Sequence, residues 1–191
     1  IAVGTKARGM GGTGIAISHG AESGISNPAM ITSIESTEIT FGGTIFMPDI
    51  ATTLSFPNMP LPPQDTLTSD ADLSMIPAVS IASKINENWY VGIGMWGVAG
   101  MGTDYSGSQN LAQGKIGNMN MVTNLQLMQF AVPIAYKAEG LSIAVSPVVQ
   151  YGNLDINYDG VDLGTFMPFS SGAGIAQDFG FGYNLGIAYD F

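Results

Sequence analysis

The chain has 191 residues, of which 46% are hydrophobic and only 10% are charged, with 15 acids against five bases and a net charge of −10. Soluble domains carry about 25% charged residues, so this composition disfavours an ordinary soluble domain. Five scattered bases do not form the basic cluster that nucleic-acid binding requires. The chain has no cysteine, which excludes disulfides and thiolate zinc sites and fits a protein that crosses an oxidising compartment.

Residues 1–37 form an N-terminal segment without strand alternation, and we interpret this segment as a plug, or hatch. No basic region and apolar stretch precede Ile1, so we expect a removed signal peptide or a truncated N-terminus. Residues 1–31 contain seven glycines and five alanines, which allow close approach to a surrounding wall. Pro28 fixes its φ angle and keeps Asn27 out of the helical region, giving a rigid exit into the first strand. The residues expected to form and gate the hatch are Gly9, Gly11, Gly12, Gly14, Asn27, Pro28 and Ala29.

Two features of this segment suggest other chemistry, and neither is sufficient. Gly9 to Gly14 satisfy the G-x-G-x-x-G spacing, but a dinucleotide loop also needs a preceding strand and a βαβ unit, which the sequence lacks. His19 is the single histidine, so no His-His metal pair is possible and no Ser-His-Asp set is indicated. We therefore predict no enzyme activity, no cofactor and no metal site.

Six strand candidates follow, and the last is the most regular. Between Asp178 and Phe191 every odd position is large and apolar, while every even position is Gly, Ala, Asn or Asp. Such alternation gives a strand one apolar face and one small, polar face, which suits a wall between lipid and a filled lumen. The candidates are Glu38–Asp49, Asp72–Ile85, Trp89–Gly100, Asn120–Lys137, Leu141–Tyr158 and Asp178–Phe191.

The candidates together predict an all-β fold, namely a transmembrane antiparallel β-barrel. No apolar run reaches the roughly 18 to 20 residues that a membrane helix needs, and only helices and closed barrels satisfy the backbone in lipid. Six strands are fewer than the roughly eight that close a membrane barrel. We therefore expect residues 38–191 to be about the first six strands of a larger barrel, although Phe191 could also be a true terminus. A soluble all-β domain is the alternative that the strand signals leave open.

Two strands carry irregularities. In the fourth candidate, Leu125 and Leu127 share one parity, whereas Met128 and Phe130 share the other; this change predicts either a bulge or a less polar lumen. The third candidate is rich in glycine, which allows a kink that opens the wall. The kink residues are expected to be Gly94, Gly97 and Gly100.

The connections alternate in length, as they do in outer-membrane barrels with short periplasmic turns and long external loops. Asn86–Asn88 and Ala138–Gly140 are short, whereas Ile50–Ala71, Met101–Met119 and Asp159–Gln177 have about twenty residues each. Aromatic residues expected to form an interfacial girdle lie at the short-turn ends: Trp89, Tyr90, Tyr136, Tyr189 and Phe191.

The loop Asp159–Gln177 is unusually apolar, and such a patch predicts a binding site for hydrophobic ligands. The alternative is that its side chains pack the loop onto its neighbours. The residues from Asp155 to Gly160 resemble a calcium loop, but Phe166 stands where the bidentate Glu is required, so a solvated turn is the better interpretation. The predicted ligand-binding residues are Leu163, Phe166, Met167 and Phe169, together with Arg8 of the hatch, which could pair with a ligand carboxylate or anchor to the lumen.

The order of motifs at the start of this chain resembles that of one known family. Gly4 to Ile17 are rich in glycine and alanine, an acid-bearing turn follows at Glu22, and Asn27-Pro28-Ala29 precedes the first strand. This order is similar to the N-terminal hatch of the FadL/TodX-type outer-membrane transporters of long-chain fatty acids and aromatic hydrocarbons. The resemblance covers residues 4–31 by motif and residues 38–191 by strand and loop pattern. It implies a fourteen-stranded barrel around the hatch, of which this chain holds the beginning.

The resemblance implies passive transport of hydrophobic compounds across the bacterial outer membrane. Its steps are capture on external loops, transfer to a lumen pocket, and release through a wall gap when the hatch rearranges. The expected partners are hydrophobic small molecules such as fatty acids and the outer-membrane lipid, and the full-length protein is expected to be a monomer. The alternatives are a structural or adhesion barrel, whose loops bind protein, and a general porin with a charged constriction.

Overall fold

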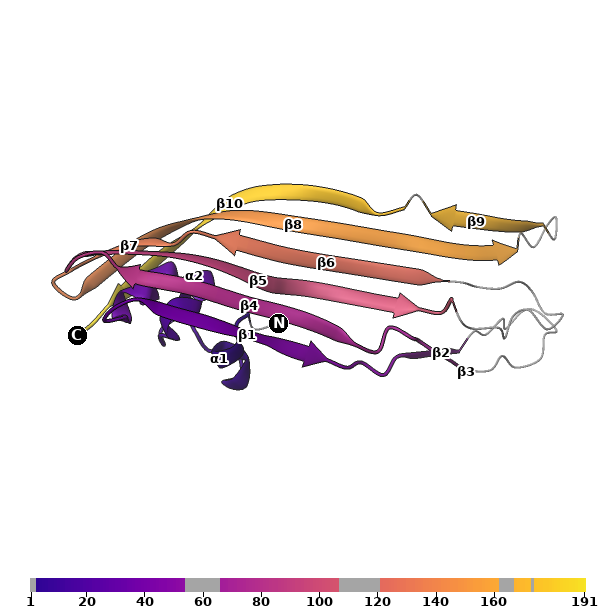
Figure 1. The fold of residues 1–191 in the computed structure, drawn as a ribbon, viewed down its shortest axis with the longest axis horizontal. Helices are drawn as coiled ribbons and strands as arrows, with labels where there is room; N and C mark the ends of the chain where they lie inside the picture. Colours follow the sequence, from indigo (N-terminus) through magenta and orange to yellow (C-terminus); the bar gives the residue numbers. More distant parts are fainter. Residues whose placement is uncertain (1–2, 54–65, 107–120, 162–166, 173) are drawn as a thin grey trace.

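The computed structural model describes residues 3–53, 66–106, 121–161, 167–172 and 174–191. Its main element is an antiparallel sheet in which the long strands follow one another in the order β1-β4-β5-β6-β8-β10 (Figure 1). All six predicted strands are present, and the predicted antiparallel all-β architecture is confirmed. Their bounds are β1 Glu38–Phe46, β4 Ser74–Lys84, β5 Trp89–Asp104, β6 Val122–Ala131, β8 Leu141–Val161 and β10 Ala176–Tyr189.

Shorter strands interrupt segments that the sequence predicts as uniform. The fourth predicted strand ends early as β6 and resumes as β7 (Ile134–Ala138), because Pro133 has no backbone N–H for a ladder hydrogen bond. The first long loop contains a separate pair, β2 (Ala51–Thr53) with β3 (Thr66–Thr68). In the third long loop, β9 (Pro168–Gly172) pairs with β8.

β5 and β8 are longer than predicted. β5 continues past Gly100 to Asp104, and β8 continues past Tyr158 to Val161. The glycines at positions 100 and 102 do not end β5, because their pairing with β6 supplies the backbone hydrogen bonds. β5 and β8 therefore extend toward the end of the sheet at which the short strands β2, β3 and β9 lie in Figure 1.

The four helical elements of the N-terminal segment (residues 3–37) lie against one face of the sheet near the short turns (Figure 1). They are α1 Thr5–Gly9, η1 Gly20–Glu22, α2 Ser23–Ser26 and η2 Pro28–Ser33. In the part of the chain that the structure describes, no helix has the length and apolar character to cross a membrane. We call the face that contacts this segment the inner face and the opposite face the outer face.

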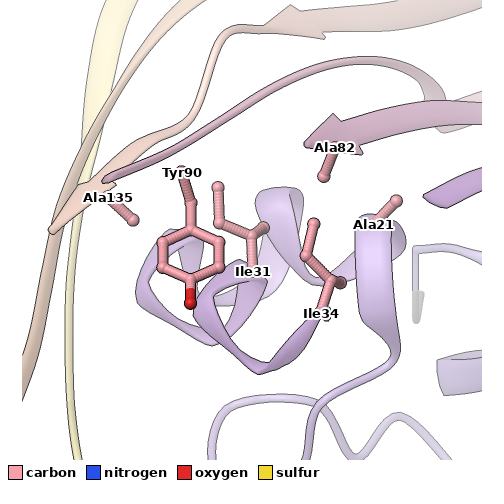
Figure 2. Close-up of a cluster of buried hydrophobic side chains, with 6 residues drawn as sticks. All are labelled: Ala21, Ile31, Ile34, Ala82, Tyr90 and Ala135. Carbon is pink, nitrogen blue, oxygen red and sulfur yellow. The ribbon is translucent and has the colours of Figure 1, made fainter. Parts of the chain in front are cut away.

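Small wall residues let this segment approach closely. Figure 2 shows one cluster, in which Ile31 and Ile34 of the segment pack with Tyr90 and Ala135 of the wall. Tyr90 is therefore an inner, buried residue, and its prediction as part of the girdle is wrong. In a second cluster Trp96 is fully buried beside Val3 and Ile25. Its ring occupies the space above Gly94, where a β-carbon would collide with it.

The outer face carries an apolar band with aromatic pairs at both ends. On β8 the outward apolar positions run from Leu141 to Tyr151, which are ten residues apart. At about 3.3 Å per residue and a strand tilt of about 40°, they span roughly 25 Å, the height of the apolar band of membrane barrels. The ring centroids are 5.1 Å apart for Trp89 with Tyr136, 5.1 Å for Tyr189 with Phe191, and 5.2 Å for Tyr151 with Phe179.

We predict that Val145→Arg, at the middle of the outer band, destabilises the full-length protein in bilayers by roughly 2–4 kcal/mol. Val145 pairs with Leu185 and Ile134, so the charge would lie in hydrocarbon. The matched control is Asn153→Arg on the same face of β8, beyond Tyr151, where a cost of about 0–1 kcal/mol is expected. Denaturant titration of both variants in vesicles measures the difference, and equal costs would contradict the position of the band.

Candidate functional site

The two faces of β8 exchange polarity along its length. Up to Tyr151 the outer positions are apolar, and the inner ones are small (Ser142 to Val148) or polar (Gln150). Beyond Tyr151 the outer positions are Asn153, Asp155 and Asn157, while the apolar residues occupy the inner positions. The pairing of β8 with β10 and β6 contains no register shift, so successive side chains keep alternating between faces. The apolar side of the wall therefore changes from outside to inside at Tyr151.

Neighbouring strands follow the same inversion. On β6, Leu125 and Leu127 lie opposite Leu154 and Gly152 on the inner face. Phe169 of β9 lies opposite Gly160, and its ring packs edge-on against Tyr158 with a centroid distance of 6.1 Å. These inner residues form one surface, which we call the apolar inner patch: Met101, Leu125, Leu127, Leu154, Ile156, Tyr158 and Phe169.

A register shift in β5 contributes Met101 to the patch. The pairing of β5 with β6 shifts between Gly97 and Ala99, so that one extra residue, Val98, lies in β5. After this bulge Met101 lies opposite Leu125, on the inner face, where it is 71% exposed. β6 itself keeps its alternation through the parity change, because it pairs with β8 without a register shift. Its apolar Leu125 and Leu127 face the inner side, which agrees with the interpretation of a less polar lumen. The bulge at this level lies in the partner strand β5, between the pairs Gly97–Met128 and Ala99–Leu127.

An open pocket of about 240 Å³ adjoins the patch. At Gly152 the backbone is bare, and a β-carbon there would lie 2.9 Å from the Leu127 side chain. Asp178 lies opposite Gly152 on the inner face. The lining consists of apolar patch residues next to amide and carboxylate groups: Leu125, Gly152, Asn153, Leu154, Ala176, Gln177 and Asp178.

The outer face beyond Tyr151 is suited to a polar environment. Its side chains bond to one another across strands: Asn153 donates to Gln126 at 3.4 Å, and Ser170 donates to Asp159 at 2.5 Å. Leu154 and Phe169, on the inner face, are 40% and 44% exposed. Exposed large apolar side chains that face inward, behind a polar exterior, are the arrangement of a binding surface.

The Asn27-Pro28-Ala29 triplet attaches the N-terminal segment to the wall. The Asn27 side chain accepts a hydrogen bond from the Ala29 amide at 3.1 Å and donates to the carbonyl oxygens of Ile15 at 2.9 Å and Ile187 at 3.1 Å. Pro28 and Ala29 are buried, and a β-carbon at Gly186 of β10 would collide with the triplet. Thr32 adds a 2.8 Å hydrogen bond to Ser142 of β8.

The first helix is attached mainly through one carboxylate. Glu22 is buried and accepts hydrogen bonds from the Thr5 amide at 3.0 Å, the Thr5 hydroxyl at 2.6 Å and the Lys6 amide at 3.1 Å. Burial opposes ionisation, but the hydrogen bonds from Thr5 and Lys6 outweigh it and hold the pKa of Glu22 below its ordinary value. Arg8 donates to the Thr44 hydroxyl of β1, and Lys6 forms an ion pair with Glu38 at 3.6 Å.

The predicted site residues fall into separate places. Leu163 and Phe166 lie outside the described residues, whereas Met167 is exposed and Phe169 joins the patch through β9. Gly9 is the exposed last residue of α1, and Gly11 and Gly12 lie in the exposed turn that follows, with positive φ angles of 71° and 93°. Gly14 is buried against Ser26. The sequence interpretation missed Met101, Leu154, Ile156 and Tyr158; the parity change of the fourth strand was the one signal of this region.

We predict that Glu22→Gln loosens α1 by about 1–3 kcal/mol, because the Gln amide is uncharged and its nitrogen cannot accept, so at least one of the three hydrogen bonds is lost. A lowered pKa makes this stabilisation fully present above the ordinary value of 4.5, and it decreases as the pH falls below 4.5 and through the folded value. Hydrogen exchange at the Thr5 and Lys6 amides measures both effects. Glu87→Gln, at an exposed ion pair with Lys84, is the control; protection that is unchanged in Glu22→Gln would contradict the role of this carboxylate.

The fold is that of three solved outer-membrane proteins. The toluene transporter TodX of P. putida superposes with a TM-score of 0.70 at 17% identity, over 96% of this chain and 51% of that one. The CymD monoaromatic hydrocarbon channel superposes with a TM-score of 0.60 at 18% identity, over 98% of this chain and 49% of that one. A Pseudomonas aeruginosa FadL homologue superposes with a TM-score of 0.57 at 12% identity, over 98% of this chain and 47% of that one. This chain therefore spans about half the length of these proteins.

No curated protein sequence matches the chain significantly. The family of outer membrane protein transport proteins (OMPP1/FadL/TodX) matches residues 2–191, which is almost the whole sequence. This match agrees with the lipid-sized outer band and with the fold of the three solved barrels. The chain thus belongs to the OMPP1/FadL/TodX family of outer-membrane β-barrel transport proteins.

Proposed function

We propose that this chain forms the hatch and part of the wall of a passive path for hydrophobic molecules across the outer membrane. The inversion of polarity at Tyr151 supports this proposal most directly. Above the lipid-sized band the apolar side chains face inward, where a molecule that has passed the polar exterior would meet them. Two of the similar solved proteins are a toluene transporter and a monoaromatic hydrocarbon channel, and this supports a hydrophobic cargo.

Capture is assigned to the apolar inner patch, with Phe169 and Met167 at its outer end. The predicted loop residues Leu163 and Phe166 remain candidates for the same step. A hydrophobic molecule gains free energy by covering exposed apolar surface, at about 25 cal/mol per Å². The patch leads toward the N-terminal segment. Along the inner faces of β6 and β8, the pairs continue from Leu125 with Leu154 to Ala131 with Val148, which pack in the cluster that this segment covers.

Gating is assigned to the exposed part of the N-terminal segment. The part around Asn27 is held by buried contacts and by bonds to two wall strands, whereas residues 9–13 are exposed. The wall opening is assigned to the glycine-rich stretch of β5. There the pairing shifts at Gly97 and Ala99, and a β-carbon on Gly97 would meet the Ile76 side chain at 2.7 Å.

Two other functions use the same fold. A general porin has a polar, water-filled lumen, and the apolar inner patch argues against that function. An adhesion barrel would bind a protein through its external loops and would not need an apolar inner surface. Saturable uptake of a hydrophobic compound separates transport from adhesion.

We predict that Leu154→Ala combined with Ile156→Ala lowers the affinity of the full-length protein for a hydrophobic ligand about tenfold or more. Each truncation removes about 1–2 kcal/mol of apolar contact, and 1.4 kcal/mol is a factor of ten in Kd. The control is Asp155→Ala with Asn157→Ala, on the outer face of the same strand and outside the pocket. Fluorescent-ligand titration measures binding, and equal affinities of the two double variants would place capture elsewhere.

We predict that deleting residues 1–17 from the full-length protein leaves the barrel assembled and opens the path. The triplet and its wall contacts remain, so the lower part of the segment keeps its packing. Leakage of small polar solutes into proteoliposomes should rise, and saturable uptake of a hydrophobic compound should fall. No change after the deletion would contradict gating.

The variant Arg8→Ala separates two roles of this residue. If Arg8 acts through its hydrogen bond to Thr44, the variant should raise leakage for all solutes. If Arg8 binds ligand, the variant should weaken affinity for carboxylates alone.

A further inference from the structure

The position of one carboxylate bears on which hydrophobic molecules use the path. Asp178 lies on the inner face of β10 and lines the pocket beside Leu125 and Leu154. Across the strands, Asp178 of β10 lies opposite Gly152 of β8, which lies opposite Leu127 of β6. We call such a set of paired residues a row. The row of Asp178 is the next inner row after that of Leu154 and Leu125, on the side of the N-terminal segment. A molecule that moves from the apolar inner patch toward the hatch therefore passes this carboxylate.

The next row toward the hatch contains no charged side chain. There Trp96 of β5 lies opposite Gln129 of β6, Gln129 donates to Gln150 of β8 at 3.0 Å, and Gln150 lies opposite Gly180 of β10. This row therefore offers a passing carboxylate no charge to offset Asp178. The Asp178 side chain is exposed and accepts a hydrogen bond from the Phe179 amide at 2.8 Å.

The basic side chains that the structure describes are all engaged elsewhere. Lys6 pairs with Glu38, and Arg8 bonds to Thr44, both on β1. At the short-turn end, Lys84 pairs with Glu87 and Lys137 pairs with Asp190. Lys115 is the fifth base and lies outside the described residues. The charge that a ligand meets at the described pocket is thus the negative charge of Asp178.

We propose that Asp178 makes this part of the path selective for uncharged hydrophobic compounds over carboxylates of the same skeleton. The inference rests on the proposed function and specifies its substrate class. A carboxylate that covers the patch with its chain is repelled by Asp178 as it moves inward, whereas a hydrocarbon or an ester is not. Because the pocket is open to solvent, the effect is modest: exposed charge pairs change affinity about two- to fivefold, and salt weakens them.

The test uses cis-parinarate and its methyl ester, two fluorescent probes with the same chain that differ in the charge and in one methyl group. Both are titrated into the full-length protein in nonionic detergent, with protein-free micelles subtracted. We expect the ester to bind more tightly than the carboxylate in the natural protein. Asp178→Asn should raise carboxylate affinity about two- to fivefold without changing ester affinity, and about 0.5 M salt should reduce the difference.

Asp155→Asn is the matched control, because it removes the same charge from the outer face of β8, opposite Asn124. If Asp155→Asn raises carboxylate affinity as much as Asp178→Asn does, or if Asp178→Asn has no effect, the inference is overturned. Saturable ester binding in that case leaves the proposed function standing. Absence of saturable ester binding in the natural protein would reject the proposed function itself. A heat-induced mobility shift in gels verifies that each variant is folded.

Discussion

The structure depends on one constraint, which is that paired strands without a bulge keep the same alternation of side chains along their whole length. Because β8 pairs regularly with both neighbours, a residue's parity alone decides whether its side chain faces the lipid or the lumen. After Tyr151 the apolar residues change from odd to even positions, and no bulge in β8 returns them to the outer face. This change divides the wall into a part that is apolar outside and a part that is apolar inside.

The lower part of the wall is built to receive the N-terminal segment. A wall that packs closely against other groups needs residues that occupy little space, and Gly94 and Gly186 leave the space that Trp96 and the Asn27 triplet occupy. A hydrogen bond between Thr32 of the segment and Ser142 of β8 adds a polar attachment to this contact. The outcome is a segment that is firmly held around Pro28 and more exposed around Gly11.

In the part of the wall beyond Tyr151, two irregularities of strand pairing each add a residue to the apolar inner patch. The bulge in β5 turns Met101 inward, and the pairing of β9 with β8 brings Phe169 beside Tyr158. Neither feature has a counterpart in the membrane-spanning part of β8. Both act where the outer face is already polar, so the apolar side chains they add do not compete with contacts to lipid.

Much of the fold followed from local patterns. The alternation from Asp178 to Phe191, the short connections at Asn86–Asn88 and Ala138–Gly140, and the glycine-rich start of the chain each depend on neighbouring residues alone, which is why strand positions and strand type were predictable. The ends of β5 and β8 were not predictable, because strand length beyond a glycine or an aspartate depends on the partner strand, which is β6 for β5 and β9 for β8. Tyr90 was misassigned for a similar reason. An aromatic residue at a strand end has the same appearance in the sequence whether it faces lipid or packs against Ile31.

The sequence by itself determined the class of the protein, because low charge, glycine content and period-two alternation describe a membrane wall wherever the strands lie. It also contained the parity change at Leu127 and Met128. Only the tertiary structure decided what that change means, since the register of β6 against β8 shows that the strand continues without a bulge. The tertiary structure likewise decided that residues as distant as Met101, Leu154 and Phe169 share one surface, because their proximity arises from pairing between strands and leaves no local signal in the chain.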